Sequence, residues 1–220
     1  INEILNSLDT TIVDEIFANN KPKKFIVNIQ TTLDESSIEY KNASEPILTI
    51  SALSCKTNTI FVLSTRNADK ESTSKIENSI NEYFKEFDIK FNLKFLYFKT
   101  EYDMLYSFFG SLCIKMPLIT GWDFVNKDWN YLNQRAKKLL INTSICSPSK
   151  NLLKYNIPQH RLVIDYFKIF DYLDNSIKIK ESSELDWIAK NTIGIGKLKT
   201  KYSLKNLYNN DFINFVLSSA

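Results

Sequence analysis

The sequence is poor in glycine, with only four glycines among 220 residues. None of them belongs to a G-x-G-x-x-G or P-loop pattern, which excludes a glycine-rich phosphate-binding loop of either kind. The single histidine, His160, is expected to be a loop residue. The three cysteines are widely spaced, and no two of them have the C-x-x-C spacing that is typical of metal-binding sites. Reduced thiols in a cytoplasmic compartment are therefore expected.

Long apolar runs are also missing, so we expect no membrane-spanning segment. No signal-peptide pattern opens the chain, and its first residue is Ile1 rather than methionine, so a piece of a longer polypeptide is expected. The net charge of +3 permits a polyanionic partner without requiring one. Hydrophobic residues make up 44% of the chain, as in a globular domain with one sizeable core.

The order of hydrophobic patterns predicts an α/β fold. Alternating apolar residues predict strands over 24–31, 46–53, 59–64 and 91–98, with the first three forming an antiparallel meander. Further strands are expected over 117–120 and from residue 162, and the latter is expected to turn helical before residue 170. Helical patterns cover 1–22, 69–87, 100–114 and 127–140, a helix is expected over 182–189, and Ser203 and Asp211 each start a short final one. This order predicts a mixed central sheet flanked by helices.

The most informative segment follows the strand over 117–120. It begins Thr120-Gly121-Trp122 and continues with Asp128, Tyr131 and Arg135 at the spacing D-x-x-Y-x-x-x-R. A strand, a glycine turn and an amphipathic helix place Asp128 near a strand end, with Tyr131 and Arg135 one and two turns further along the helix. The segment resembles the second exonuclease motif of family B DNA polymerases, T-G-W-N-x-x-x-F-D-x-x-Y-x-x-x-R.

Other segments resemble the same family in the same order. They include residues 45–51 after the first-motif strand, residues 101–107 before the second motif, residues 162–168, and residues 183–189 followed by Gly194 to Lys197. The resemblance covers roughly residues 24–217, and it implies a ribonuclease-H-like exonuclease fold of phage or viral type. We expect residues 1–23 to form a helical N-terminal extension and residues 24–220 to form the exonuclease-like domain.

The resemblance implies a two-metal site that uses Mg²⁺ or Mn²⁺, with acids from three motifs. In this chain the first motif, Asp-Ile-Glu in the family, reads Asn28-Ile29-Gln30. The tyrosine of the third motif falls on Ser218, and its aspartate would lie beyond Ala220, so that motif is expected to be truncated or lost. Asp128 is the one clear metal ligand, which implies weak or absent metal binding. Asp123 and Asp165 are candidate replacement carboxylates.

Two interpretations of function remain open at this point. In the first, the chain is an exonuclease-type domain of, or derived from, a family B DNA polymerase that no longer cleaves and serves as a scaffold or a single-stranded DNA-binding module. In the second, it is an active 3′–5′ proofreading exonuclease bearing Asp→Asn and Glu→Gln substitutions. The implied partners are the 3′ end of single-stranded DNA, a polymerase domain and DNA replication proteins in the cytoplasm of a host cell. The candidate DNA contacts are Trp122, Tyr131, Arg135, Lys197 and Lys199. The same residues also fit structural roles: Trp122 and Tyr131 as core aromatics, Arg135 as a surface or salt-bridge residue, and the two lysines as a solvated basic turn.

Overall fold

A computed structural model of the chain describes residues 23–33, 38–173, 184–196 and 202–218. The helix expected over 1–22 lies outside these residues. Within the described ranges, no helix combines the length and the apolar character needed to cross a bilayer.

The described residues form one six-stranded mixed sheet in the order β4-β3-β2-β1-β5-β6. Strands β1, β2 and β3 pair antiparallel, whereas β4 runs parallel to β3, β5 runs parallel to β1, and β6 runs parallel to β5. The strand bounds are β1 Lys24–Gln30, β2 Thr49–Ser54, β3 Thr59–Ser64, β4 Asn92–Tyr97, β5 Leu118–Gly121 and β6 Leu162–Asp165. This topology confirms the predicted α/β class with a mixed central sheet.

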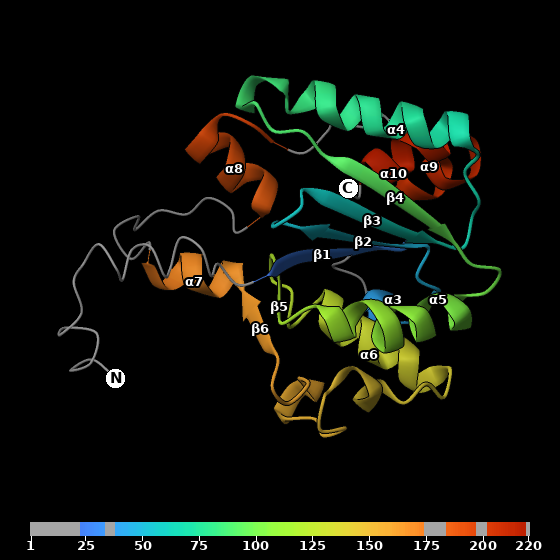
Figure 1. The fold of residues 1–220 in the computed structure, drawn as a ribbon, viewed down its shortest axis with the longest axis vertical. Helices are drawn as coiled ribbons and strands as arrows, with labels where there is room; N and C mark the ends of the chain where they lie inside the picture. The colour runs from blue at the N-terminus through green and yellow to red at the C-terminus, as the bar shows by residue number, and fades with distance from the viewer. Residues whose placement is uncertain (1–22, 34–37, 174–183, 197–201, 219–220) are drawn as a thin grey trace.

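Helices cover both faces of the sheet (Figure 1). One face carries α4 (Lys70–Tyr83), α9 (Leu204–Asn210) and α10 (Phe212–Leu217), and the other carries α3 (Ile38–Lys41), α5 (Glu101–Ser107) and α6 (Asp128–Lys138). Helices α7 (Tyr166–Leu173) and α8 (Leu185–Ile193) lie toward one end of the sheet.

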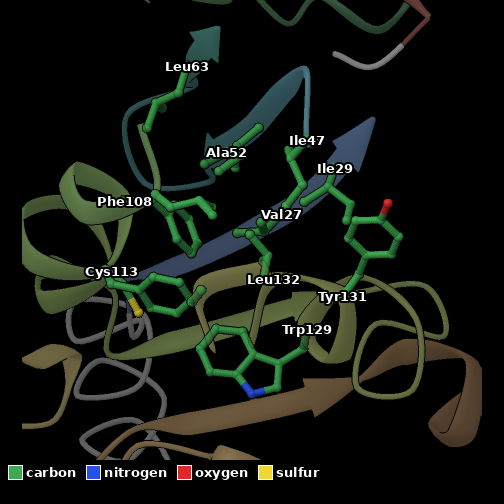
Figure 2. Packing of buried hydrophobic residues seen from close by; sticks show 14 of the residues in the cluster. Val27, Ile29, Ile47, Ala52, Leu63, Phe108, Cys113, Trp129, Tyr131 and Leu132 are labelled. Carbon is green, nitrogen blue, oxygen red and sulfur yellow. The ribbon is translucent and has the colours of Figure 1, made fainter. Parts of the chain in front are cut away.

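Two hydrophobic clusters correspond to the two faces of the sheet. Phe25, Val27 and Ile29 of β1 belong to the cluster that also contains the buried rings of α6, and Figure 2 shows Ile29 and Val27 pointing toward Tyr131 and Leu132. The second cluster joins α4 to α9 and α10. The odd-numbered side chains of β1 therefore point to α6, and the even-numbered ones point to the opposite face.

Most predicted elements are confirmed with small shifts at their ends. Thr100 caps α5 by accepting a hydrogen bond from the backbone N–H of Asp103, and Ser203 and Asp211 cap α9 and α10 in the same way. The helix predicted over 69–87 breaks at Phe84, and the helix predicted over 100–114 gives way after Ser107 to a π-turn over Phe108–Leu112. The helix predicted to start at residue 182 begins at Leu185 and extends to Ile193, where Gly194 adopts a left-handed conformation that ends it.

The C-terminus of α6 ends in a Schellman motif without a glycine. The N–H of Ile141 donates to the carbonyl of Ala136, and that of Leu140 donates to the carbonyl of Lys137. Leu140 occupies the left-handed position at φ 58° and is 91% exposed. A residue that carries a side chain is strained by about 1–2 kcal/mol in this conformation. Glycine avoids the strain, but the greater conformational entropy that it gives the unfolded chain offsets part of the gain in stability.

We therefore expect Leu140→Gly to raise the free energy of unfolding by about 0.5–1 kcal/mol. Urea denaturation of the variant measures the change. Leu140→Ala is the matched control, because it removes the same exposed side chain but keeps the strained conformation. A gain as large in Leu140→Ala as in Leu140→Gly would contradict the explanation.

Candidate functional site

The turn after β5 brings the chain back against β1 before α6 begins. Thr120 pairs with Ile26 of β1, and a Cβ atom on Gly121 would lie 2.8 Å from the carbonyl oxygen of Val27. Only glycine fits this close backbone approach. Asp123 follows in a left-handed conformation, at φ 49°, and its carboxylate accepts a hydrogen bond from the side chain of Asn126. The T-G-W-D segment thus serves as a tight turn that starts α6 at Asp128.

Asp128 is the first residue of α6 and is only 8% exposed. Its Oδ1 accepts a hydrogen bond of 3.3 Å from the hydroxyl of Tyr40, a residue of α3. The ring of Tyr40 packs on that of Tyr131, one turn along α6, with the centroids 4.6 Å apart. The carboxylate therefore lies at the N-terminus of a helix, where the helix dipole favours a negative charge.

Tyr131 is buried at 1% exposure, and its hydroxyl donates a 2.7 Å hydrogen bond to the carbonyl of Glu45. Burial raises the pKa of Tyr131 to about 12. Tyr131 thus anchors the segment between α3 and β2 to α6.

This pKa predicts a loss of stability at high pH. Between about pH 10 and pH 12 the unfolded chain loses the proton of this tyrosine while the folded chain keeps it. The free energy of unfolding therefore falls as the pH rises through this window. Because Tyr131→Phe removes this titration, the decline in unfolding free energy across that window should be smaller in the variant by on the order of 2 kcal/mol. Chemical denaturation at several pH values measures it. Equal declines in the two proteins would contradict a raised pKa.

Arg135, two turns along α6, forms a buried ion pair. Its Nε and Nη2 atoms donate to the two carboxylate oxygens of Glu101 at 2.9 and 2.5 Å, and Nη1 donates to the carbonyls of Ala43 and Ser44. Glu101 also accepts a hydrogen bond from the N–H of Ile47, and its hydrogen bond to Arg135 raises the pKa of Arg135. This is the geometry of a structural ion pair that ties α5, α6 and the segment before β2 together.

The two first-motif positions lie on the even-numbered face of β1. Asn28 pairs with Ser51 of β2 and is partly exposed, whereas Gln30 is 5% exposed. The side-chain Nε2 of Gln30 donates to the hydroxyl of Ser218 at 3.2 Å, and that hydroxyl donates to the carbonyl of Phe215. Gln30 Oε1 is buried without a hydrogen-bond partner. The structure thus joins the second position of the first motif to the residue at which the third-motif tyrosine was expected.

The remaining candidate carboxylates support turns. Asp165, at the end of β6, accepts hydrogen bonds from the N–H groups of Val125 and Phe167. Asp123 lies 3.7 Å from the ammonium of Lys127 in addition to its contact with Asn126.

The donor chemistry does not fit a pair of divalent cations. Amide oxygens can coordinate a metal but cannot neutralise its charge, and Asn28 and Gln30 both present amides. Among the residues that the structure describes, no three His, Cys, Asp or Glu side chains lie close enough to hold a metal ion. The residues at these motif positions therefore do not fit a two-metal site.

Of the other predicted DNA contacts, the structure describes only Trp122. The ring of Trp122 is partly exposed and packs against Phe167 and Phe170 of α7, at centroid distances of 5.5 and 5.7 Å. Lys197 and Lys199 lie outside the described residues. The sequence did not predict Tyr40 as the partner of Asp128 or Glu101 as the partner of Arg135, because each contact joins segments that are distant in the chain.

Comparison with known families gives the relationship. No curated protein sequence matches the chain significantly. The family model for the exonuclease domain of DNA polymerase family B matches residues 13–188, which is well over half of the chain and includes the first two motif segments. The match ends within α8, before α9 and α10. Together with the mixed sheet and the turn that places Asp128, this match shows that the chain belongs to the family B DNA polymerase exonuclease domains.

Proposed function

We propose that this exonuclease domain is impaired in phosphodiester cleavage and acts as a scaffold or a single-stranded DNA-binding module. The observation that carries the proposal is the buried amide of Gln30, which donates a hydrogen bond to Ser218. The Ser218 hydroxyl accepts from this amide while it donates to the carbonyl of Phe215, and a carboxylate at position 30 could bond to it only if the hydroxyl proton turned away from Phe215.

The size of the electrostatic loss supports the same proposal. Two-metal hydrolysis depends on anionic ligands that hold two divalent ions about 4 Å apart. A pair of unit charges at that distance contributes about 4 kcal/mol at an effective dielectric of 20, and a divalent ion roughly doubles the value. The neutral amides at positions 28 and 30 do not provide this attraction to a divalent ion, and Asp128 alone cannot replace it.

The alternative is an active exonuclease in which acids at positions 28 and 30 have been replaced. Lys127 and Ser218 argue against it, because they also depart from the family pattern. The family has phenylalanine and tyrosine at these positions, and replacing those neutral residues removes no negative charge. We expect Asn28→Asp with Gln30→Glu, made in a polypeptide that includes any natural sequence after Ala220, to remain unable to degrade labelled single-stranded DNA with Mg²⁺. Robust Mg²⁺-dependent cleavage by this variant would support the alternative.

A binding role predicts affinity for single-stranded DNA without cleavage. The partly exposed Trp122 offers an aromatic face at the turn before Asp128, and base stacking on such a ring is worth about 1–3 kcal/mol. Fluorescence anisotropy with a labelled oligonucleotide should show an affinity that falls as salt increases, because phosphate contacts release counterions. Negligible affinity at low salt would reject the DNA-binding module and leave scaffolding.

A further inference from the structure

Strand β4 is an edge of the six-stranded sheet and pairs only with β3 among the strands that the structure describes (Figure 1). The N–H groups of Asn92 and Phe98 donate to carbonyls of β3 and of the turn before it, each at 2.9 Å. Successive backbone groups of a strand point in opposite directions, so the even-numbered residues of β4 bond to β3. The N–H and C=O groups of Leu93, Phe95 and Tyr97 therefore point to the open edge. An edge of this kind is a template for one more strand.

The two faces of β4 differ in what they would offer an added strand. Lys94 and Leu96 are exposed on one face, where the Lys94 ammonium lies 5.7 Å from the centroid of the Phe61 ring on β3. On the other face, Leu93 and Phe95 pack against the hydrophobic cluster that joins α4 to α9 and α10. An added strand would therefore meet a lysine and a leucine on one face and an apolar cluster on the other.

The charge along β4 has one sign. Residues 89–100 contain three lysines, Lys90, Lys94 and Lys99, and no acidic residue. All three lysines are exposed, and none of them forms an ion pair within the described ranges. Opposite charges that face each other on neighbouring strands stabilise the strand pair. The edge therefore favours an incoming strand that places acidic side chains on the face of Lys94.

The same charge disfavours a second copy of this chain at the edge. Two β4 strands that pair antiparallel about a two-fold axis at their middle would bring the two Lys94 side chains onto one face of adjoining strands. Like charges in such positions destabilise the pair, and a lysine on an edge strand is a common protection against self-association. This protection does not extend to an acidic strand.

We propose that β4 accepts an extended acidic peptide segment of a partner protein as a seventh strand. The peptide backbone bonds to the N–H and C=O groups of Leu93, Phe95 and Tyr97, and its acidic side chains lie beside Lys94. Its alternate, apolar side chains extend the cluster at Leu93 and Phe95. Main-chain hydrogen bonds supply the affinity in this mode of recognition, and alternate side chains supply the specificity. The proposal does not depend on whether the domain cleaves or binds DNA.

The hydrogen-bonding pattern of the edge favours a peptide over a nucleic acid. A peptide backbone carries a donor and an acceptor at each residue, whereas phosphate groups are acceptors only. Phosphates could pair with the lysines, but they would leave the edge carbonyls of Leu93, Phe95 and Tyr97 without donors.

The test is a titration of the purified chain with a labelled seven-residue peptide, blocked at both ends, in which valine alternates with glutamate. We expect it to bind about tenfold more tightly than the same peptide with lysine in place of glutamate. Binding should also slow hydrogen exchange at the backbone amides of Leu93, Phe95 and Tyr97. The amides of Lys94 and Leu96 should not change, because they already bond to β3.

Two pairs of variants separate the backbone contribution from the charge contribution. Tyr97→Pro removes an N–H that points to the open edge, and Tyr97→Ala removes the same ring but keeps that N–H. Tyr97→Pro should bind the glutamate peptide about tenfold more weakly than Tyr97→Ala. Lys94→Glu should reverse the preference in favour of the lysine peptide. Lys137→Glu, at an exposed position on α6, changes the net charge equally and should leave the preference as it was.

Melting temperatures show whether each variant is folded, and Lys94→Glu keeps the test decisive if Tyr97→Pro is not. No binding of the glutamate peptide at millimolar concentration, binding without protection of the three edge amides, or an unchanged preference in Lys94→Glu would overturn the proposal. Sedimentation of the chain alone as a dimer that Tyr97→Pro dissociates would assign the edge to a second copy. A single-stranded oligonucleotide that protects the edge amides when the peptide does not would assign it to nucleic acid, and either result would overturn the proposal.

Discussion

Replacing Glu101 with leucine is expected to lower the free energy of unfolding by about 3–5 kcal/mol. Both members of the Glu101–Arg135 pair are nearly buried, with side-chain exposures of 10% and 11%. Removal of the carboxylate leaves the buried guanidinium with hydrogen bonds to the neutral carbonyls of Ala43 and Ser44, and it also leaves the N–H of Ile47 without its acceptor. An uncompensated buried charge accounts for most of the expected loss.

The matched control is an exposed ion pair. Lys75 and Glu71 of α4 form an i,i+4 pair with side-chain exposures of 59% and 76%, so Glu71→Leu should change stability by less than about 0.5 kcal/mol. A double replacement, Glu101→Leu with Arg135→Met, should recover part of the loss because it removes the stranded charge. If Glu101→Leu cost no more than Glu71→Leu in urea denaturation, the pair would not have the buried structural role described here.

Gln30→Glu is expected to destabilise the domain by about 2–4 kcal/mol at pH 8 in the presence of a chelator. The replacement places a carboxylate where only 5% of the side chain is exposed, and it removes the N–H donor that now contacts Ser218. The folded chain favours the protonated acid, so stability should fall as the pH rises above the unfolded-state pKa of about 4.3.

Gln30→Met serves as the control for this replacement. It keeps the size of the side chain, loses the bond to Ser218 and removes the unpartnered Oε1 atom, so its stability should stay within about 1 kcal/mol of the original. Equal stabilities of Gln30→Glu and Gln30→Met at pH 8 would mean that the position accommodates a buried charge, which would argue against a site built for an amide.

The sheet and the second motif were largely predictable because their signals are local. Alternation of Phe25, Val27 and Ile29 identified β1, and capping residues such as Thr100 located helix starts. The glycine of the T-G-W-D segment indicated a turn, and the structure supplies its reason in the close approach of Gly121 to Val27. The local sequence was therefore enough to predict that a helix begins near Asp128.

The contacts among the site residues were not predictable from one sequence. Tyr40 reaches Asp128 across 88 residues, and Gln30 reaches Ser218 across 188. Arg135 shows the consequence, because the sequence left a DNA contact and an ion pair open, and only the structure identifies Glu101 of α5 as its carboxylate partner. Helix ends also shifted where packing overrode periodicity, as at Phe84, whose ring packs against Phe91.

The most direct test of the central claim is cleavage of single-stranded DNA by the unmodified chain. A 5′-labelled oligonucleotide is incubated with the protein and Mg²⁺ or Mn²⁺, and the products are resolved by length. We predict no metal-dependent shortening, because Asn28 and Gln30 place neutral amides where the family uses acids. Progressive shortening from the 3′ end that stops when EDTA is added would contradict the account.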